Sequence, residues 1–181
     1  DFQRYAGADV DIVCYGISSR LRRGEVDALA EARSLWFVPR ELPESCTPLF
    51  TALQQDRKIT TEDVWTRIRI GLEAGRIALA RRAAEYLPPG EEPNFRVLTH
   101  ISSNAPAYLA KEQFDTGNRA GRETAMFAVY RLARISPRQA ATHWARLESR
   151  FAPEERAYVW SQIGYFGALR HDPDAMTWFG R

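Results

Sequence analysis

The sequence has few of the side chains that metal and redox sites require. Its 181 residues include only two cysteines and three histidines. Cys14 and Cys46 are too far apart for the C-x-x-C spacing of a zinc or redox motif. His100, His143 and His171 are isolated from one another, and no H-E-x-x-H pattern occurs. We therefore expect no metal site and no cofactor.

Other absences exclude further classes of protein. No glycine-rich phosphate loop and no G-x-S-x-G nucleophile motif is present. No apolar run approaches the roughly 18 residues that a membrane span needs, and the first residues lack the pattern of a signal peptide. Lysine is rare, so 23 of the 25 basic residues are arginine, and 23 acidic residues leave a net charge of +2. This near balance disfavours a dedicated nucleic-acid surface.

Apolar residues recur at helical spacing along most of the chain. Val10, Val13, Cys14 and Ile17, for example, share one face of a helix. No segment shows strand alternation bounded by hairpin turns. The pattern predicts an all-α fold, a right-handed superhelical stack of short antiparallel helix pairs similar to an α-solenoid of tetratricopeptide type. The expected helices cover residues 10–21, 25–36, 49–53, 61–75, 77–87, 95–101, 108–114, 119–135, 137–147 and 154–166, with a last one after 174.

Local signals refine this expectation. Thr60 suits the N-cap of one helix, and Ser136 followed by Pro137 suits the start of another. The stretch 88–93 is the strongest loop signal, so we treat residues 1–181 as part of one α-superhelical domain with a subdivision near 88–93. The last helix ends with two adjacent aromatic residues, and we expect a further helix to pack on Met176 to Phe179.

Several features have both a structural and a functional interpretation. The five tryptophans fall at helical positions typical of a core, although one or two exposed ones would suit stacking on sugar rings. The hairpin from Thr60 to Leu87 carries arginines, but helical hairpins far outnumber DNA readers. Paired acids such as Glu154 and Glu155 suit helix starts better than catalysis. Spacing alone leaves Cys14 and Cys46 as either a disulfide or two buried thiols.

The combination of several segments resembles the helical region of the soluble lytic murein transglycosylases of Gram-negative bacteria. The element Leu-Pro-x-x-Cys-x-x-Leu, with an earlier cysteine before it, is typical of that family. The residues that carry the resemblance are Cys14–Tyr15, Ser18–Arg20, Leu42–Leu49, Asp63–Arg69 with Leu72 and Gly75, and Glu155–Trp160 with Gly164 and Tyr165. Their order and spacing resemble the family across most of the chain.

The resemblance implies a segment of a U-shaped superhelix that closes into a ring with a linker domain. In the family, a separate lysozyme-like domain uses one glutamate to cleave peptidoglycan between N-acetylmuramic acid and N-acetylglucosamine, giving 1,6-anhydro products. That glutamate lies in a Glu-Ser pair followed by Gly-Leu-Met-Gln and Ala-Tyr-Asn-Ala-Gly elements. The pairs Glu44–Ser45 and Glu148–Ser149 lack both elements. We therefore assign no catalytic residue and expect the catalytic domain to lie outside this chain.

The resemblance also implies a periplasmic location, where a Cys14–Cys46 disulfide is the expected state. The implied partners are peptidoglycan glycan strands and the linker and catalytic domains of the same parent protein, with no nucleic acid and no membrane span. The function we expect is that of a non-catalytic scaffold segment of a lytic transglycosylase in cell-wall turnover. The alternative is an independent helical-repeat adaptor that binds a protein partner in its groove.

Overall fold

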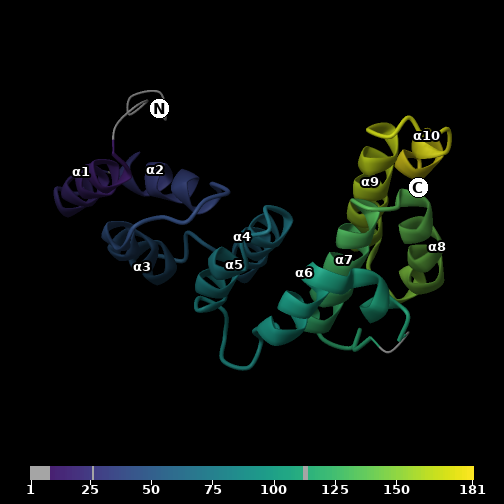
Figure 1. Ribbon diagram of the computed structural model, residues 1–181. Coiled ribbons are helices and arrows are strands. Elements are labelled where there is room, and N and C mark those ends of the chain that lie inside the picture. The colour runs from purple at the N-terminus through teal and green to yellow at the C-terminus, as the bar shows by residue number, and fades with distance from the viewer. Residues whose placement is uncertain (1–8, 26, 112–113) are drawn as a thin grey trace. The chain divides into compact units, whose positions relative to one another are not determined.

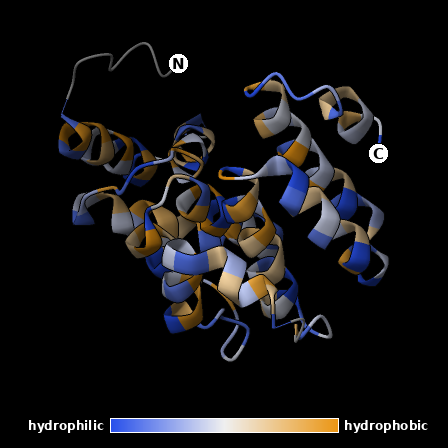
Figure 2. Cartoon of the chain, turned by 45° about the vertical axis from the view of Figure 1, so that its right-hand side comes forward, coloured by the Kyte–Doolittle hydropathy of each residue, from blue (hydrophilic) through white to orange (hydrophobic). Residues whose placement is uncertain are grey.

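The computed structural model describes residues 9–25, 27–111 and 114–181, and these residues form helices joined by turns and loops. No strand occurs among these residues, so the all-α prediction is confirmed. The chain divides into two compact units, the first ending at Pro88 and the second beginning at Pro89 (Figure 1). Hydrophobic and hydrophilic residues alternate around the helices in both units (Figure 2), as the helical spacing of the sequence requires.

Among its described residues, unit 1 contains five α-helices and one short 3₁₀-helix. Its core contains the largest fully buried side chains of this half, among them Trp36, Trp65 and Leu49. The helices are α1 (Val10–Arg22), α2 (Asp27–Trp36), η2 (Glu44–Cys46), α3 (Thr47–Gln55), α4 (Thr61–Glu73) and α5 (Ile77–Ala84). The helix expected over 25–36 includes position 26, which lies outside the described residues.

The start of α4 shows how local sequence fixes a boundary. Thr60 caps the helix as predicted, because its Oγ1 accepts a hydrogen bond from the Asp63 N–H at 3.2 Å. The Asp63 carboxylate in turn accepts from the Thr60 N–H at 2.8 Å. Further along, a Cβ at Gly71 would lie 2.9 Å from the Ala80 backbone nitrogen. Glycine therefore lets α4 and α5 pack with their backbones in close approach.

Unit 2 surrounds a central helix, α7 (Arg119–Ala133), which contacts the helices before and after it. Nearly every residue from Glu123 to Ala133 is buried, which is typical of a helix covered on all sides. The other helices of the unit are α6 (Phe95–Leu109), α8 (Pro137–Leu147), η3 (Glu148–Arg150), α9 (Pro153–Ala168) and α10 (Ala175–Phe179).

The last two helices meet through glycines. A Cβ at Gly167 would lie 2.6 Å from the Trp178 ring, and one at Gly164 would lie 2.9 Å from the Phe179 ring. Trp178 is consequently buried, with only 8% of its surface exposed. Of the segment Met176 to Phe179, on which we expect a further helix to pack, Trp178 is therefore already covered by α9. Met176 and Phe179 remain exposed.

Several helix boundaries differ from the sequence prediction by one or two residues, and two differ by more. α5 ends at Ala84 rather than at Leu87. The short helix expected over 108–114 is instead a second part of α6, which ends at Leu109, and residues 112–113 lie outside the described part. Asn104 interrupts α6 with non-helical backbone angles (φ −149°, ψ 67°). Its side-chain oxygen accepts from the Ala107 N–H at 3.2 Å and restarts the helix just before Pro106, which lacks a backbone donor.

Two expectations about individual side chains also change. Ser136 precedes α8 as predicted, but its hydroxyl makes no capping hydrogen bond. All five tryptophans are buried, with exposures between 0% and 8%, so none is available for stacking on a sugar. No helix among the described residues is long and apolar enough to cross a membrane.

Candidate functional site

The two cysteines join α1 to η2. Cys14 and Cys46 form a disulfide with an S–S distance of 2.02 Å, and their Cα atoms lie 5.0 Å apart. Both residues are fully buried. This is the state that the resemblance implied, and it leaves no free thiol. The bridge is structural, since a buried disulfide offers neither a nucleophile nor a metal ligand.

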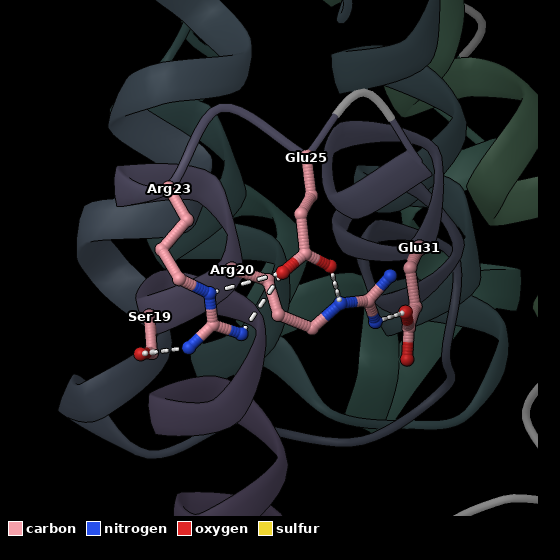
Figure 3. Close-up of polar contacts among 5 residues, drawn as sticks. All are labelled: Ser19, Arg20, Arg23, Glu25 and Glu31. Atoms are coloured by element: carbon pink, nitrogen blue, oxygen red, sulfur yellow. Dashed lines mark hydrogen bonds and ion pairs between the residues drawn. The ribbon is translucent and has the colours of Figure 1, made fainter.

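A cluster of charged residues fastens α1 to α2 at the turn where Gly24 adopts a positive φ of 76°. The Glu25 carboxylate lies between two guanidinium groups (Figure 3), accepting from Arg20 Nε at 2.8 Å and from Arg23 Nη2 at 2.9 Å. Arg20 also donates to Glu31 of α2. The hydrogen bonds from Arg20 and then Arg23 hold the pKa of the Glu25 carboxyl below its usual value. Both carboxylates are thus engaged in holding the turn.

Unit 1 also contains a cavity of about 300 Å³ that is lined by a buried arginine. Arg67 of α4 is 4% exposed, and its Nη1 donates to the backbone carbonyl of Trp36, the last residue of α2. The guanidinium carbon lies 5.0 Å from the centre of the Trp36 ring and 5.6 Å from that of Phe50. Trp36 makes edge-to-face contacts with Phe50 at 5.1 Å and Tyr86 at 5.0 Å. One cation and three aromatic rings therefore form a single cluster.

The charge of Arg67 has no carboxylate partner among the described residues. Burial lowers the pKa of its guanidinium to about 10, against a smaller opposing effect of Tyr86, so the group stays charged at neutral pH. The carbonyl end of α2 and the faces of the rings stabilise this charge in part. Burial likewise raises the pKa of Tyr86, helped by the neighbouring Glu85 carboxylate.

The rim of this cavity has the opposite sign of charge. Glu41, Glu44 and Glu85 line it, are exposed, and make no ion pair among the described residues. Arg82 is exposed at the same rim. The unit-1 cavity thus carries a positive group in its buried wall and an excess of carboxylates at its opening.

A second cavity, of about 640 Å³, lies within unit 2, between residues 90–97, Tyr108 and the start of α7. Its polar groups are largely used by the chain itself. Asn118 caps α7 by accepting from the Gly121 N–H at 2.8 Å. Asp115 accepts from the Asn118 side chain at 2.5 Å, and Arg119 forms an ion pair with Glu123 at 2.7 Å. These polar groups therefore stabilise the turn before α7 and the start of that helix.

The two Glu-Ser pairs have different surroundings. Glu44 begins η2 and lines the unit-1 cavity. Glu148 accepts a hydrogen bond from the buried Trp160 indole N–H at 2.7 Å, so it satisfies a core donor. No cluster of three metal-ligating side chains occurs among residues that the structure describes. That the chain carries no catalytic residue stays a prediction.

Sequence reasoning missed Arg67. The sequence did contain a signal, because Arg67 lies three positions after Val64 and so falls within the apolar stripe of α4. A basic residue at a core position is rarely buried without a specific role. What no spacing could indicate is the partner, since the Trp36 carbonyl lies 31 positions earlier in the sequence.

Comparisons with known proteins give structural relatives only. No family model matches the sequence, and no curated protein does. The lytic transglycosylase Slt from Pseudomonas aeruginosa, solved as an inactive mutant, matches 94% of this chain with 26% identity and a TM-score of 0.72. The 70 kDa soluble lytic transglycosylase Slt70 from Escherichia coli matches 96% with 17% identity and a TM-score of 0.58.

The match covers a much smaller share of each relative than of this chain. The match spans 28% of the Pseudomonas protein and 29% of the Escherichia protein. The chain therefore corresponds to less than a third of either relative. The similarity confirms the resemblance inferred from the sequence and shows that the helical fold is shared with these enzymes.

Proposed function

We propose that this chain, a region related to the Slt lytic transglycosylases, is a non-catalytic scaffold segment of a periplasmic enzyme that cleaves peptidoglycan. The parent would cut the bond between N-acetylmuramic acid and N-acetylglucosamine and release 1,6-anhydro products during cell-wall turnover. In this proposal the helical stack positions linker and catalytic domains that belong to the rest of the parent protein. The observation that carries it is the similarity to Slt over 94% of the chain with a TM-score of 0.72.

The acidic side chains support the non-catalytic part of the proposal. A general acid in glycoside cleavage needs a carboxyl whose pKa is raised. The pKa shifts of Glu25 and Asp63 run downward instead. Glu148 accepts from Trp160, and Glu155 forms an ion pair with Arg122 at 3.0 Å. Such carboxylates serve the fold as acceptors and not as proton donors to a sugar.

The test compares two proteins on purified murein sacculi. One is the complete product of the gene that encodes this chain, and the other is residues 1–181 alone. Soluble products are separated by liquid chromatography and identified by mass spectrometry. The complete protein should release anhydromuropeptides, and the chain alone should release none.

Each arm can fail separately. Release by residues 1–181 would show that the chain holds its own catalytic site and would contradict the scaffold assignment. A complete protein that folds but releases no anhydro product would contradict the parent activity. Hydrolytic products without the anhydro ring would assign the parent to ordinary glycoside hydrolysis.

A further inference from the structure

We propose that the unit-1 cavity is a binding site for a small zwitterion, namely an amino acid or a peptide end that carries both a carboxylate and an ammonium group. The carboxylate would lie against Arg67, and the ammonium would lie at the rim among Glu41, Glu44 and Glu85. This site is independent of the peptidoglycan-cleaving activity proposed above, because it lies within unit 1 and uses none of the elements expected of a catalytic domain.

At the buried wall of the cavity, Arg67 offers hydrogen-bond donors to a ligand. Only Nη1 has an acceptor among the described residues, the Trp36 carbonyl. The edge formed by Nε and Nη2 is therefore available, and this edge offers the two parallel N–H groups that bind a carboxylate in bidentate fashion. Since Arg67 is only 4% exposed, an ion pair formed here would be screened little by water or salt.

The opening of the unit-1 cavity has a net negative charge. Three exposed carboxylates against one exposed arginine, Arg82, make the rim acidic. A simple anion such as inorganic phosphate would meet this rim before it reached Arg67, so like-charge repulsion disfavours it. In a zwitterion, the carboxylate would instead pair with Arg67, and an ammonium group a few atoms away would pair with the carboxylates of the rim.

Size and wall chemistry limit the ligand further. A volume of about 300 Å³ is at the lower end of small-molecule sites and suits an amino acid or dipeptide. Trp36, Phe50 and Leu79 provide apolar surface for the intervening carbon atoms. Tyr86 lines the same cavity.

The experiment uses alanyl-alanine and two derivatives that each lack one charge. The N-acetyl form has no ammonium, and the C-terminal amide has no carboxylate. Binding to the chain at neutral pH is followed by ¹H–¹⁵N NMR through the Trp36 indole N–H, which donates to the Asp63 carbonyl at 3.0 Å. The dipeptide should shift this signal in a saturable manner, with amidation raising Kd at least tenfold and acetylation raising it at least threefold.

Variants assign each charge to its side chain. Arg67→Met should raise the Kd of alanyl-alanine at least tenfold and remove the difference between the dipeptide and its amide. Glu44→Gln combined with Glu85→Gln leaves only Glu41 at the rim and should reduce the difference between the dipeptide and its acetyl form. The matched control, Glu91→Gln with Glu154→Gln, removes two exposed carboxylates of unit 2 and should leave every Kd unchanged.

If Arg67→Met does not fold, the proposal can still be tested with the substitutions at the exposed Glu44 and Glu85 and with the two derivatives of alanyl-alanine. Equal binding of all three peptides to the wild-type chain would overturn it. Absence of any saturable shift at 50-fold excess over a millimolar protein sample would overturn it as well. Binding of inorganic phosphate more tightly than alanyl-alanine would show an anion site of a different kind and would contradict the assignment.

Discussion

Removing the Cys14–Cys46 disulfide should destabilise unit 1 strongly and leave unit 2 unchanged. The perturbation is the double substitution Cys14→Ala with Cys46→Ala, which deletes two sulfur atoms from fully buried positions. The bridge joins α1 to η2 and spans α2, so without it the unfolded chain gains the freedom of the whole intervening segment.

The magnitude follows from the length of that segment. The two cysteines are 32 positions apart. In the chain-entropy model, closing a loop of this length removes entropy worth about 3.7 kcal/mol at 25 °C from the unfolded state. At roughly 1.4 kcal/mol for each factor of ten, this corresponds to an approximately 400-fold change in the unfolding equilibrium. Loss of the packed sulfur atoms adds a smaller cost of the same sign.

Hydrogen exchange followed by mass spectrometry is the suitable assay because it reports each unit separately. The most protected amides of α2 and α4 should lose protection by a few hundredfold in the double variant. Amides of α7, in unit 2, provide the internal control and should not change. Thiol titration of the unfolded, unreduced wild type should find no free thiol, and two free thiols would remove the premise.

The single variants test whether loop closure is the source of the stabilisation. Either Cys14→Ala or Cys46→Ala alone breaks the bridge, so each should destabilise unit 1 nearly as much as the double variant does. If the cysteines acted only as two packed apolar side chains, the losses from the single variants would add up to that of the double. Additive losses, or a total below about 1 kcal/mol, would refute the loop-closure argument.

Two further predictions concern helix boundaries and helix contacts. Asp63→Asn should cost unit 1 about 1 kcal/mol at pH 7, measured by urea unfolding, because it weakens the capping box with Thr60. Burial alone would raise the pKa of Asp63, but the Thr60 hydrogen bonds and Arg33 together lower it, so this contribution is present above about pH 3.8 and disappears as the pH falls through the lower folded-state pKa. Gly167→Ala should lower Tm and expose Trp178 to solvent, seen as a red shift in fluorescence, although alanine ordinarily favours a helix by about 1 kcal/mol. Gly180→Ala, whose nearest new contact would be 3.6 Å away, is the control and should leave both readouts unchanged.

Helix positions followed from the sequence because their causes are local. The hydroxyl of Thr60 and the ring of Pro137 act on the residues next to them, and apolar spacing of 3.6 residues marks each buried face. The same locality explains the errors. At Asn104 the side chain competes with the backbone for hydrogen bonds, and apolar periodicity does not register that competition.

The candidate site followed much less from the sequence, because tertiary contacts build it. The disulfide was an open alternative from spacing, and the resemblance made it the expected state. The unit-1 cavity requires Arg67, the end of α2 and the residue Tyr86 beyond α5 to meet, and no periodic pattern links these three. Burial of all five tryptophans removed the one expected sugar-stacking surface, again through packing that spacing cannot distinguish from exposure.

The energetics of Arg67 favour a ligand over a purely structural role. Two other arginines that connect helices have carboxylate partners, since Arg33 pairs with Asp63 at 2.7 Å and Arg122 pairs with Glu155 at 3.0 Å. Arg131 of α7 donates to the Ser102 carbonyl of α6 at 2.6 Å, but it is less buried than Arg67. Burying an unpaired charge costs several kcal/mol, whereas a helix end and an aromatic face each return about 1–2 kcal/mol. A bound carboxylate would supply the missing partner only in the folded state. Alanyl-alanine at 100 times its Kd should therefore stabilise unit 1 by about 2.7 kcal/mol, and an unchanged unfolding midpoint at that concentration would mean that Arg67 serves the fold alone.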